Sequence, residues 1–310
     1  MKLKVGTRGS KLALHQTRQV IDLIRQQQPD IEIEETIIKT LGDKVTDLPL
    51  FKVGGQGLFI KEIEQALLDG RIDIAVHSLK DVPHKIAEGL ELVAYGLPQD
   101  PRDCFLSKKF KNLNELPSGS LIGTSSLRRR AQLAQIRPDL KFSDFRGNLD
   151  TRLQKLEQGE VDAIILAAAG LLRFSQGNKI GELFPIEKLT PPAGQAIIAV
   201  ECRSKDSVQI SEILELFSDK NSKTRALCER AFLKEIQGGC QTPMAAHAQI
   251  NGAKITLHSF IGKPDGSKTI RRTDTGPVDK PEILGKRAAM ALIDAGGLEL
   301  LAKPQEENQR

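Results

Sequence analysis

The sequence predicts an α/β protein with two similar lobes, followed by a smaller α+β domain. Residues 2–18 and 120–136 read alike: each has a short apolar stretch, a Gly-Thr turn, hydroxyl side chains, arginine and the start of a helical pattern. The closing segments of the two units also agree, at 70–76 and 159–165. Such a duplication implies two lobes of related α/β architecture. After Ser218 the pattern changes to one helix followed by alternating strands.

The first lobe alternates helices and strands. Apolar side chains at helical spacing predict a helix over 13–24, and a strand follows at 31–38. Residues 41–57 are glycine-rich and lack a period, which is typical of a functional loop. We expect a helix over 59–67 and a strand over 72–77 that leads into Ser-Leu-Lys-Asp-Val-Pro.

The second lobe repeats this alternation over 121–174. It contains a predicted strand near 140–145, the turn 146–148, a helix with Arg152, and the nearly unbroken apolar run 161–172.

A proline-rich stretch at 189–195 predicts a crossover, and the apolar residues 196–200 predict a strand. The third domain is expected to hold helices over 224–236 and 281–295, with strands between them. We therefore expect these boundaries: first lobe 1–98 with 196–217, second lobe 99–195, and C-terminal domain 218–310.

Composition narrows the function classes. The net charge of +5 is mildly basic, which fits anionic ligands without requiring nucleic acid. No apolar run reaches the ~18 residues needed to span a bilayer, and the N-terminus enters a strand without a signal-peptide pattern, so we expect a cytoplasmic protein without membrane contacts. The four cysteines and five histidines are scattered, and no metal site is expected.

Arginines stand at or just beyond the ends of predicted strands. Ligands of open α/β sheets bind outside the carboxyl ends of the strands, and a guanidinium holds a carboxylate through two parallel hydrogen bonds. The alternative for each arginine is a solvated surface charge. A nucleic-acid patch at 128–130 is disfavoured because the chain has one tyrosine and no tryptophan. The arrangement predicts a cleft for a ligand with several negative charges. Its arginines are Arg8, Arg128, Arg129, Arg146, Arg152 and Arg173.

Two further residues are candidates for chemistry. Asp81 follows an apolar strand beside Lys80 and faces the predicted cations, so it should stay ionised and could stabilise a developing cation or relay protons; the alternative is a turn cap. Cys240 follows two glycines and precedes Gln-Thr-Pro, which indicates a loop thiol able to carry a covalent group; the alternative is a small buried side chain.

With these segments taken together, the chain resembles the porphobilinogen deaminase family, also called hydroxymethylbilane synthases. The likeness extends over essentially the whole length. Its most specific stretches are Gly-Thr-Arg-Gly-Ser-Lys-Leu-Ala-Leu at 6–14, Gly-Leu-Phe-Ile-Lys-Glu-Ile-Glu at 57–64, Asp-Ile-Ala-Val-His-Ser-Leu-Lys-Asp-Val-Pro at 73–83, Gly-Thr-Ser-Ser-Leu-Arg-Arg at 123–129, Arg-Gly-Asn at 146–148, Asp-Ala-Ile-Ile-Leu-Ala at 162–167 and Gly-Gly-Cys-Gln at 238–241.

The resemblance implies a three-domain enzyme whose first two domains resemble type II periplasmic binding proteins. Such enzymes join four porphobilinogen units head to tail, release ammonia each time, and free the linear tetrapyrrole hydroxymethylbilane. They carry a dipyrromethane primer on a loop cysteine through a thioether, which falls here on Cys240 by its position in Gly-Gly-Cys-Gln. The implied partners are porphobilinogen and the growing polypyrrole chain, and the implied state is a monomer.

The resemblance also assigns residues. Asp81 corresponds to the catalytic aspartate. The positions implied to hold the cofactor, besides Cys240, are Ser78, Lys80, Thr124, Ser125, Ser126, Arg128, Arg129 and Arg146. Those implied to bind substrate are Arg8, Ser10, Lys52, Arg146, Arg152, Arg173 and Gln195.

Two positions depart from the family pattern. Gln56 stands where many relatives have lysine, and Lys52 would supply that charge instead; Ala196 replaces a glycine in the crossover.

The main alternative to an enzyme is a non-catalytic cytosolic binding protein for a polycarboxylate. Two similar lobes alone would suit such a protein. It would carry no covalent group on Cys240 and would show no turnover.

Overall fold

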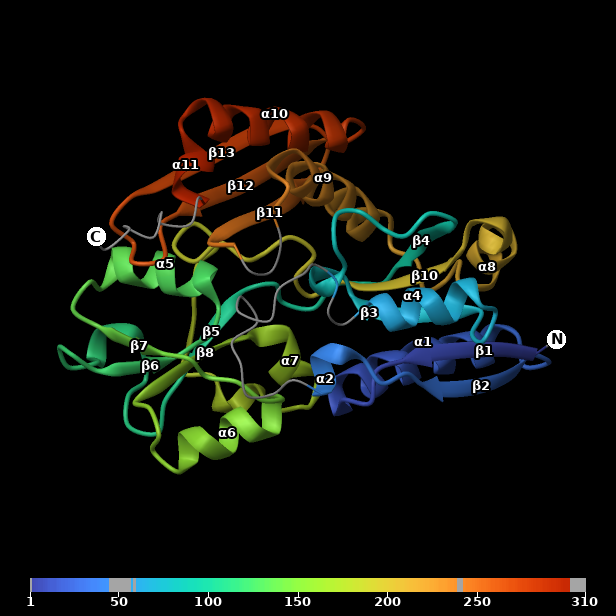
Figure 1. Cartoon of the computed structure of the whole chain (residues 1–310), viewed down its shortest axis with the longest axis horizontal. Coiled ribbons are helices and arrows are strands. Elements are labelled where there is room, and N and C mark those ends of the chain that lie inside the picture. Colours follow the sequence, from blue (N-terminus) through green and yellow to red (C-terminus); the bar gives the residue numbers. More distant parts are fainter. Residues whose placement is uncertain (1, 45–56, 58–59, 239–241, 302–310) are drawn as a thin grey trace, which may run out of the picture.

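The described part of the protein is a mixed α/β structure with three β-sheets. The computed structural model describes residues 2–44, 57, 60–238 and 242–301; Lys52, Gln56 and Cys240 lie outside these residues. Two sheets have five strands each, and a separate C-terminal sheet has three. Figure 1 shows the two five-stranded sheets side by side, with the C-terminal elements against both.

The first sheet has the strand order β2-β1-β3-β10-β4. Strands β1, β2 and β3 are parallel, whereas β10 runs antiparallel to β3 and β4. Its strands are β1 Lys2–Thr7, β2 Glu32–Ile37, β3 Ile74–Ser78, β4 Leu90–Tyr95 and β10 Ile198–Arg203. The associated helices are α1 Lys11–Gln27, α2 Leu41–Lys44, α4 Lys61–Leu68 and α8 Ser207–Ile213. The predicted helices 13–24 and 59–67 and the strands 31–38 and 72–77 are confirmed, with ends shifted by a few residues.

The second sheet has the corresponding order β7-β6-β8-β5-β9. Here too the strand beside the third parallel strand is antiparallel, because β5 pairs antiparallel with β8. Its strands are β5 Asp103–Leu106, β6 Leu121–Gly123, β7 Lys141–Ser143, β8 Ala163–Ala167 and β9 Glu182–Leu183. Its helices are α5 Leu127–Ile136, α6 Leu149–Glu157 and α7 Ala168–Arg173. The two similar lobes predicted from the internal duplication are therefore confirmed.

The apolar run 161–172 is not one element. It splits into strand β8 and helix α7, which meet at Ala167 and Ala168. Both elements are largely buried, so the sequence keeps its apolar character across the boundary and shows no change of period there.

The C-terminal sheet is an antiparallel meander with the order β11-β12-β13. Helices α9 and α10 pack against it, with Phe232, Leu257 and Leu292 in the shared core. The strands are β11 Met244–Asn251, β12 Lys254–Gly262 and β13 Thr269–Pro277, and the helices are α9 Lys220–Ile236, α10 Pro281–Asp294 and α11 Gly297–Leu301.

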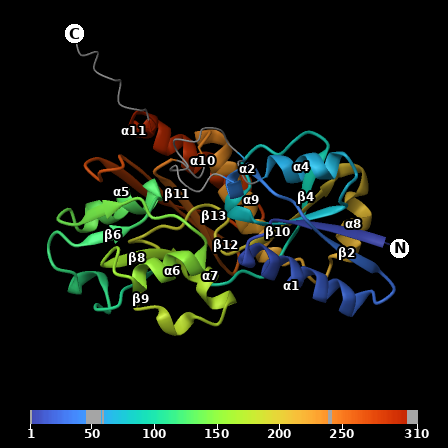
Figure 2. The ribbon, with the colours of Figure 1, turned by 60° about the horizontal axis from the view of Figure 1, so that its bottom comes forward.

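Core packing supports the domain boundaries that the sequence predicts. One buried cluster joins residues of β1 and α1 with residues of β10 and α8, although these segments lie far apart in the chain. In Figure 2, helices α5, α6 and α7 lie on one side of the molecule, and helices α1 and α4 lie on the other. We therefore propose that 196–217 returns to the first lobe and that 99–195 forms the second.

Within the described residues, no helix is both long enough and apolar enough to cross a bilayer.

Candidate active site

The turn after β3 carries the predicted catalytic aspartate. Leu79–Asp81 forms one turn of 3-10 helix, and Leu79 is buried whereas Lys80 and Asp81 are half-buried. The backbone N–H of Leu79 donates to the carbonyl of Ile197 at 3.0 Å, and that of Val82 donates to the carbonyl of Leu79 at 3.1 Å. The buried leucine therefore anchors the turn and leaves the two charged side chains at the surface of the site.

A fully buried carboxylate, Asp103, lies at the start of β5. It accepts hydrogen bonds from Nη2 of Arg128 at 2.7 Å, Nη2 of Arg129 at 2.7 Å and Nε2 of Gln195 at 3.0 Å. Burial opposes ionisation of this group, but the two guanidinium groups outweigh burial and hold the pKa of Asp103 well below its usual range. Asp103 is therefore a permanent anion that organises two of the predicted arginines.

Arg128 and Arg129 lie in the first turn of α5. Ser126 caps this helix, since its Oγ accepts the backbone N–H of Arg129 at 3.4 Å. Arg128 also donates to the carbonyl of Thr190 at 2.7 Å, and Arg129 donates to that of Ile165 at 2.9 Å. Both guanidinium groups are thus fixed by internal partners, a role that the sequence did not predict for them.

Lys80 links the two sheets at this point. Its Nζ donates to Oε1 of Gln195 at 3.4 Å, while Nε2 of Gln195 donates to Asp103 and to the carbonyl of Pro101 at 2.7 Å. Burial lowers the pKa of Lys80; Asp81 and Asp103 oppose this effect, and the nearby arginines add to it. Hydrogen bonds through Gln195 and Asp103 therefore link Lys80, which follows β3 in the first lobe, to Arg128 at the start of α5 in the second lobe.

Arg146 and Arg152 extend the positive charge. Burial, together with the charges of Arg129 and Arg146, lowers the pKa of Arg152 to about 10. The Nε of Arg152 donates to the carbonyl of Gly147 at 2.9 Å. Nη1 of Arg146 and Nε of Arg129 are buried and have no hydrogen-bond partner among the described residues. We call Lys80, Arg128, Arg129, Arg146 and Arg152 the cationic cluster.

Arg173 and Arg8 lie at other element ends. Arg173 ends α7, its Nη2 donates to the carbonyl of Ala196 at 2.9 Å, and burial lowers its pKa to about 10. Arg8 is half-buried directly after β1. Arg173 therefore lies beside the crossover, at the end of the second lobe's third helix.

Three hydroxyl groups that were predicted to bind cofactor or substrate accept hydrogen bonds from nearby backbone N–H groups. Ser10 caps α1 by accepting the N–H of Ala13 at 3.3 Å, and Ser125 accepts the N–H of Phe145 at 2.9 Å. Thr124 accepts the N–H of Ser126 at 3.3 Å. Because each oxygen acts as an acceptor here, its O–H proton can still be donated to a ligand.

Ser78 differs, since its Oγ donates to Oε1 of Gln16 at 3.0 Å. The Oγ of Ser78 can therefore accept a hydrogen bond from a ligand.

The cationic cluster fits a ligand with several carboxylates. Its five cations face two nearby carboxylates, those of Asp81 and Asp103, and Asp103 is already saturated by two arginines. Within the described part of the chain, Asp81 makes no hydrogen bond or ion pair. The lowered pKa values and the unpaired donors of Arg129 and Arg146 show that this site favours added negative charge.

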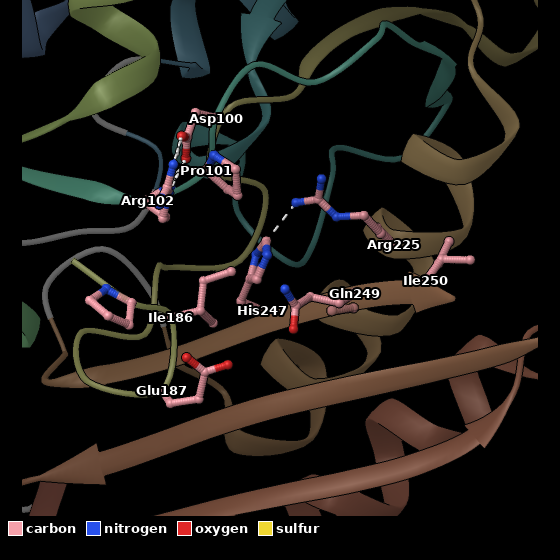
Figure 3. A pocket seen from close by; sticks show the side chains of 11 residues that line it. Asp100, Pro101, Arg102, Ile186, Glu187, Arg225, His247, Gln249 and Ile250 are labelled. Atoms are coloured by element: carbon pink, nitrogen blue, oxygen red, sulfur yellow. Dashed lines mark hydrogen bonds and ion pairs between the residues drawn. The ribbon is translucent and has the colours of Figure 1, made fainter. Parts of the chain in front are cut away.

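A separate cavity of about 480 Å³ lies beside β11 (Figure 3). Its wall includes Asp100, Arg102, Arg225 and His247 but none of the predicted site residues. Arg102 is held by Asp100 at 2.6 Å, and Arg225 lies 3.4 Å from Nδ1 of His247. The cavity is therefore distinct from the cationic cluster.

Asp103 is the site residue that the sequence analysis missed. Its signal in the sequence is an acid directly before the buried stretch Cys-Phe-Leu at 104–106. An acid so close to a buried strand needs a buried partner, but the sequence does not say that the partner is Arg128 and Arg129.

Comparisons with solved structures find substrate-binding proteins. An ABC transporter periplasmic substrate-binding protein from Coxiella burnetii is 13% identical, with a TM-score of 0.45 over 70% of this chain and 92% of that one. A nutrient binding protein from Burkholderia cenocepacia bound to methionine is 15% identical, with a TM-score of 0.42 over 69% of this chain and 90% of that one.

Comparisons of sequence are more decisive. The family model for the dipyrromethane cofactor binding domain of porphobilinogen deaminase matches residues 3–211, and the model for the C-terminal domain of porphobilinogen deaminase matches residues 223–294. A porphobilinogen deaminase from Brevibacillus brevis is 46% identical over 100% of this chain and 99% of its own length. One from Geobacter sulfurreducens is 45% identical over 97% of this chain and 94% of its own length. By these matches, which span both the lobes and the C-terminal domain, the chain belongs to the porphobilinogen deaminase family.

Proposed function

We propose that this enzyme joins four porphobilinogen molecules head to tail, with loss of one ammonia at each addition, to form hydroxymethylbilane. The family membership supports an enzyme over a non-catalytic binding protein. The observation that carries the proposal is the cationic cluster around the Lys80–Asp81 turn. Each pyrrole of the substrate has an acetate and a propionate side chain, so a growing chain presents the many carboxylates that this cluster favours.

The covalent primer is dipyrromethane, which we assign to the thiol of Cys240 through a thioether. When bound, dipyrromethane supplies the pyrrole carbon to which the first substrate is added. Lys80, Arg128, Arg129 and Arg146 are proposed to hold its carboxylates, together with the hydroxyl groups of Ser78, Thr124, Ser125 and Ser126. The unpaired Nη1 of Arg146 and Nε of Arg129 support this assignment.

Asp81 is proposed to act on the substrate pyrrole. When ammonia leaves porphobilinogen, the C–N bond breaks and the pyrrole ring carries positive charge. The carboxylate of Asp81 would accept a hydrogen bond from the pyrrole N–H and stabilise that cation. After the new C–C bond forms, the proton lost from the coupling carbon would pass to the same carboxylate.

The remaining assignments concern substrate binding. Arg8, Ser10, Lys52, Arg152 and Arg173 are proposed to bind the carboxylates of incoming and earlier pyrroles. Arg146 would serve both primer and substrate, and Gln195 would act there while bridging Lys80 and Asp103. The lowered pKa values of the half-buried Arg152 and Arg173 support this, because a partly desolvated cation gains from a carboxylate partner.

We further propose a cytoplasmic monomer with neither nucleic acid nor membrane as a partner. The mild net charge of +5 and the scarcity of tyrosine and tryptophan support this view.

The proposed function is tested by the mass of the purified protein from cells that make porphyrins. Wild type should carry an adduct of two pyrrole units and should convert porphobilinogen into a linear tetrapyrrole. Cys240→Ala should lack the adduct and the activity, while Cys104→Ala, which alters a buried cysteine, should keep both. An unmodified wild-type protein without product would contradict the proposal.

Asp81→Asn should preserve the fold and the adduct but lower kcat by about 10²–10⁴, because an amide cannot stabilise the cation or accept its proton. Intact mass and steady-state kinetics check this together. The matched control is Asp22→Asn on α1, where the acid is exposed and lies 3.9 Å from Arg25. A kcat near that of wild type in Asp81→Asn would refute the catalytic role of this carboxylate.

Lys80 predicts a pH dependence of primer orientation. Its pKa lies below the usual 10.5, so rising pH removes this charge before that of an ordinary lysine, and kcat should then fall because the primer carboxylates lose a partner. Lys80→Arg keeps a charge at higher pH and should move the alkaline fall of kcat to higher pH. An identical alkaline limb in both proteins would mean that Lys80 does not bind primer carboxylates.

A further inference from the structure

Two neighbouring residues of α9 contact segments next to the Lys80–Asp81 turn: Glu229 contacts the crossover at Gly194, and Arg230 contacts residues 82–84. Helix α9 belongs to the C-terminal core, where it packs on β11, and it also contacts β4 of the first sheet. Figure 1 shows α9 between the C-terminal strands and the first sheet. Helix α9 ends at Ile236, and Cys240 follows four positions later in the sequence.

Glu229 binds the crossover segment at Gly194, which packs against the Lys80–Asp81 turn. Its carboxylate is fully buried, and its two oxygens accept the backbone N–H groups of Gly194 at 2.6 Å and Ala248 at 2.8 Å. A guanidinium nitrogen of Arg225 lies 3.6 Å from the same group. Glu229 thus ties the crossover to β11 within the C-terminal sheet.

Gly194 transmits this restraint to the turn. Its φ of +75° lies in the left-handed region, and a Cβ there would lie 2.7 Å from Cγ of Leu79 and 2.8 Å from the backbone nitrogen of Lys80. The backbone of the crossover is therefore pressed against the first residues of the turn. The N–H of Leu79 also donates to Ile197 of the same crossover.

Arg230 holds the chain after the turn. Its Nη2 donates to the carbonyls of Pro83 at 2.9 Å and His84 at 3.2 Å, and its Nη1 donates to that of Val82 at 3.4 Å. One planar guanidinium group therefore fixes three successive carbonyls that directly follow Asp81. A lysine in its place could not reproduce this set, because it has a single nitrogen.

We propose that Glu229 and Arg230 are positioning residues that fix the Asp81 turn relative to α9. Asp81 would then keep a defined place relative to α9, whose last residue lies four positions before Cys240 in the sequence. The inference rests on the proposed function, because that function makes Asp81 and Cys240 the groups that have to meet. Neither residue is required to touch the substrate; both act through the backbone around Lys80 and Asp81. Misplacing a catalytic group by about 1 Å can cost about 10² in rate.

The variants for the test are Arg230→Gln, Arg230→Lys and Glu229→Gln, with Lys223→Gln as a matched control. Lys223 is an exposed residue of the same helix, so this control removes one positive charge from α9 without a contact to the turn. Hydrogen exchange is measured on the purified, cofactor-loaded protein without substrate. Intact mass confirms loading, and kcat and KM for porphobilinogen are determined on the same samples.

In Arg230→Gln, the amides of residues 79–82 and 84 should exchange several-fold faster than in wild type, and kcat should fall about tenfold or more with little change in KM. Arg230→Lys should be intermediate in both measurements, and Lys223→Gln should match wild type. Glu229→Gln should show the same local effect on exchange; if it does not fold, the Arg230 variants decide the question.

Unchanged exchange at these amides in Arg230→Gln would overturn the proposal, as would faster exchange with a normal kcat. A general loss of stability, with faster exchange throughout the protein and unchanged kcat, would overturn it too. The exchange measurement needs no turnover. It therefore stays informative if Asp81→Asn proves active, an outcome that contradicts the catalytic assignment of Asp81 instead.

Discussion

The site depends on the ion pairs that buried Asp103 forms with Arg128 and Arg129. An unpaired buried carboxylate would cost several kcal/mol, so the two guanidinium groups have to stay where they are. Gln195 donates a hydrogen bond to Asp103 and accepts one from Lys80, which follows a strand of the other five-stranded sheet. One acid therefore sets the position of charged groups from both lobes and from the crossover between them. Since this one acid binds two arginines, positive charge remains for a ligand.

The duplication explains why these groups meet. Each lobe places a strand end, a turn and a helix start at the same edge of its sheet. The first lobe contributes the turn with Lys80 and Asp81, and the second contributes the start of α5 with its arginines. The two lobes differ in charge at this point: the first presents Lys80 beside the carboxylate of Asp81, and the second presents Arg128 and Arg129 bound to Asp103.

The crossover near 194–197 serves several of these contacts. Gln195 bridges Lys80 and Asp103, and Arg173 donates to Ala196. Gly194 and Ala196 both have a φ of +75°, which is an unfavourable conformation for alanine. The surrounding contacts hold Ala196 in it, so this segment is defined by its neighbours more than by its own preference.

The sequence was informative where contacts are local. Helical spacing located α1, and the repeated Gly-Thr segments predicted two similar lobes and placed Asp81 at a strand end. The pairing of strands that lie far apart in the chain could not be predicted from the sequence. The antiparallel place of β10 beside β3 joins residues such as Ala75 and Glu201, and no local pattern encodes that partnership.

The candidate site shows the same limit. The cationic residues could be proposed from their places at strand ends, but Asp103 could not be paired with Arg128 and Arg129 from the sequence. The inward direction of these two guanidinium groups follows only from the packing of α5 against β5 and β8. The contacts of Glu229 with the crossover and of Arg230 with residues 82–84 likewise join segments that are distant in the chain.

The role of the cationic cluster is tested most directly by a crystal structure of the enzyme with its covalent primer attached. We expect primer carboxylates within about 3 Å of nitrogen atoms of the cationic cluster, and a carboxylate oxygen of Asp81 that accepts a hydrogen bond from a pyrrole N–H. A primer whose carboxylates face solvent, with Asp81 turned away from every pyrrole ring, would contradict this role.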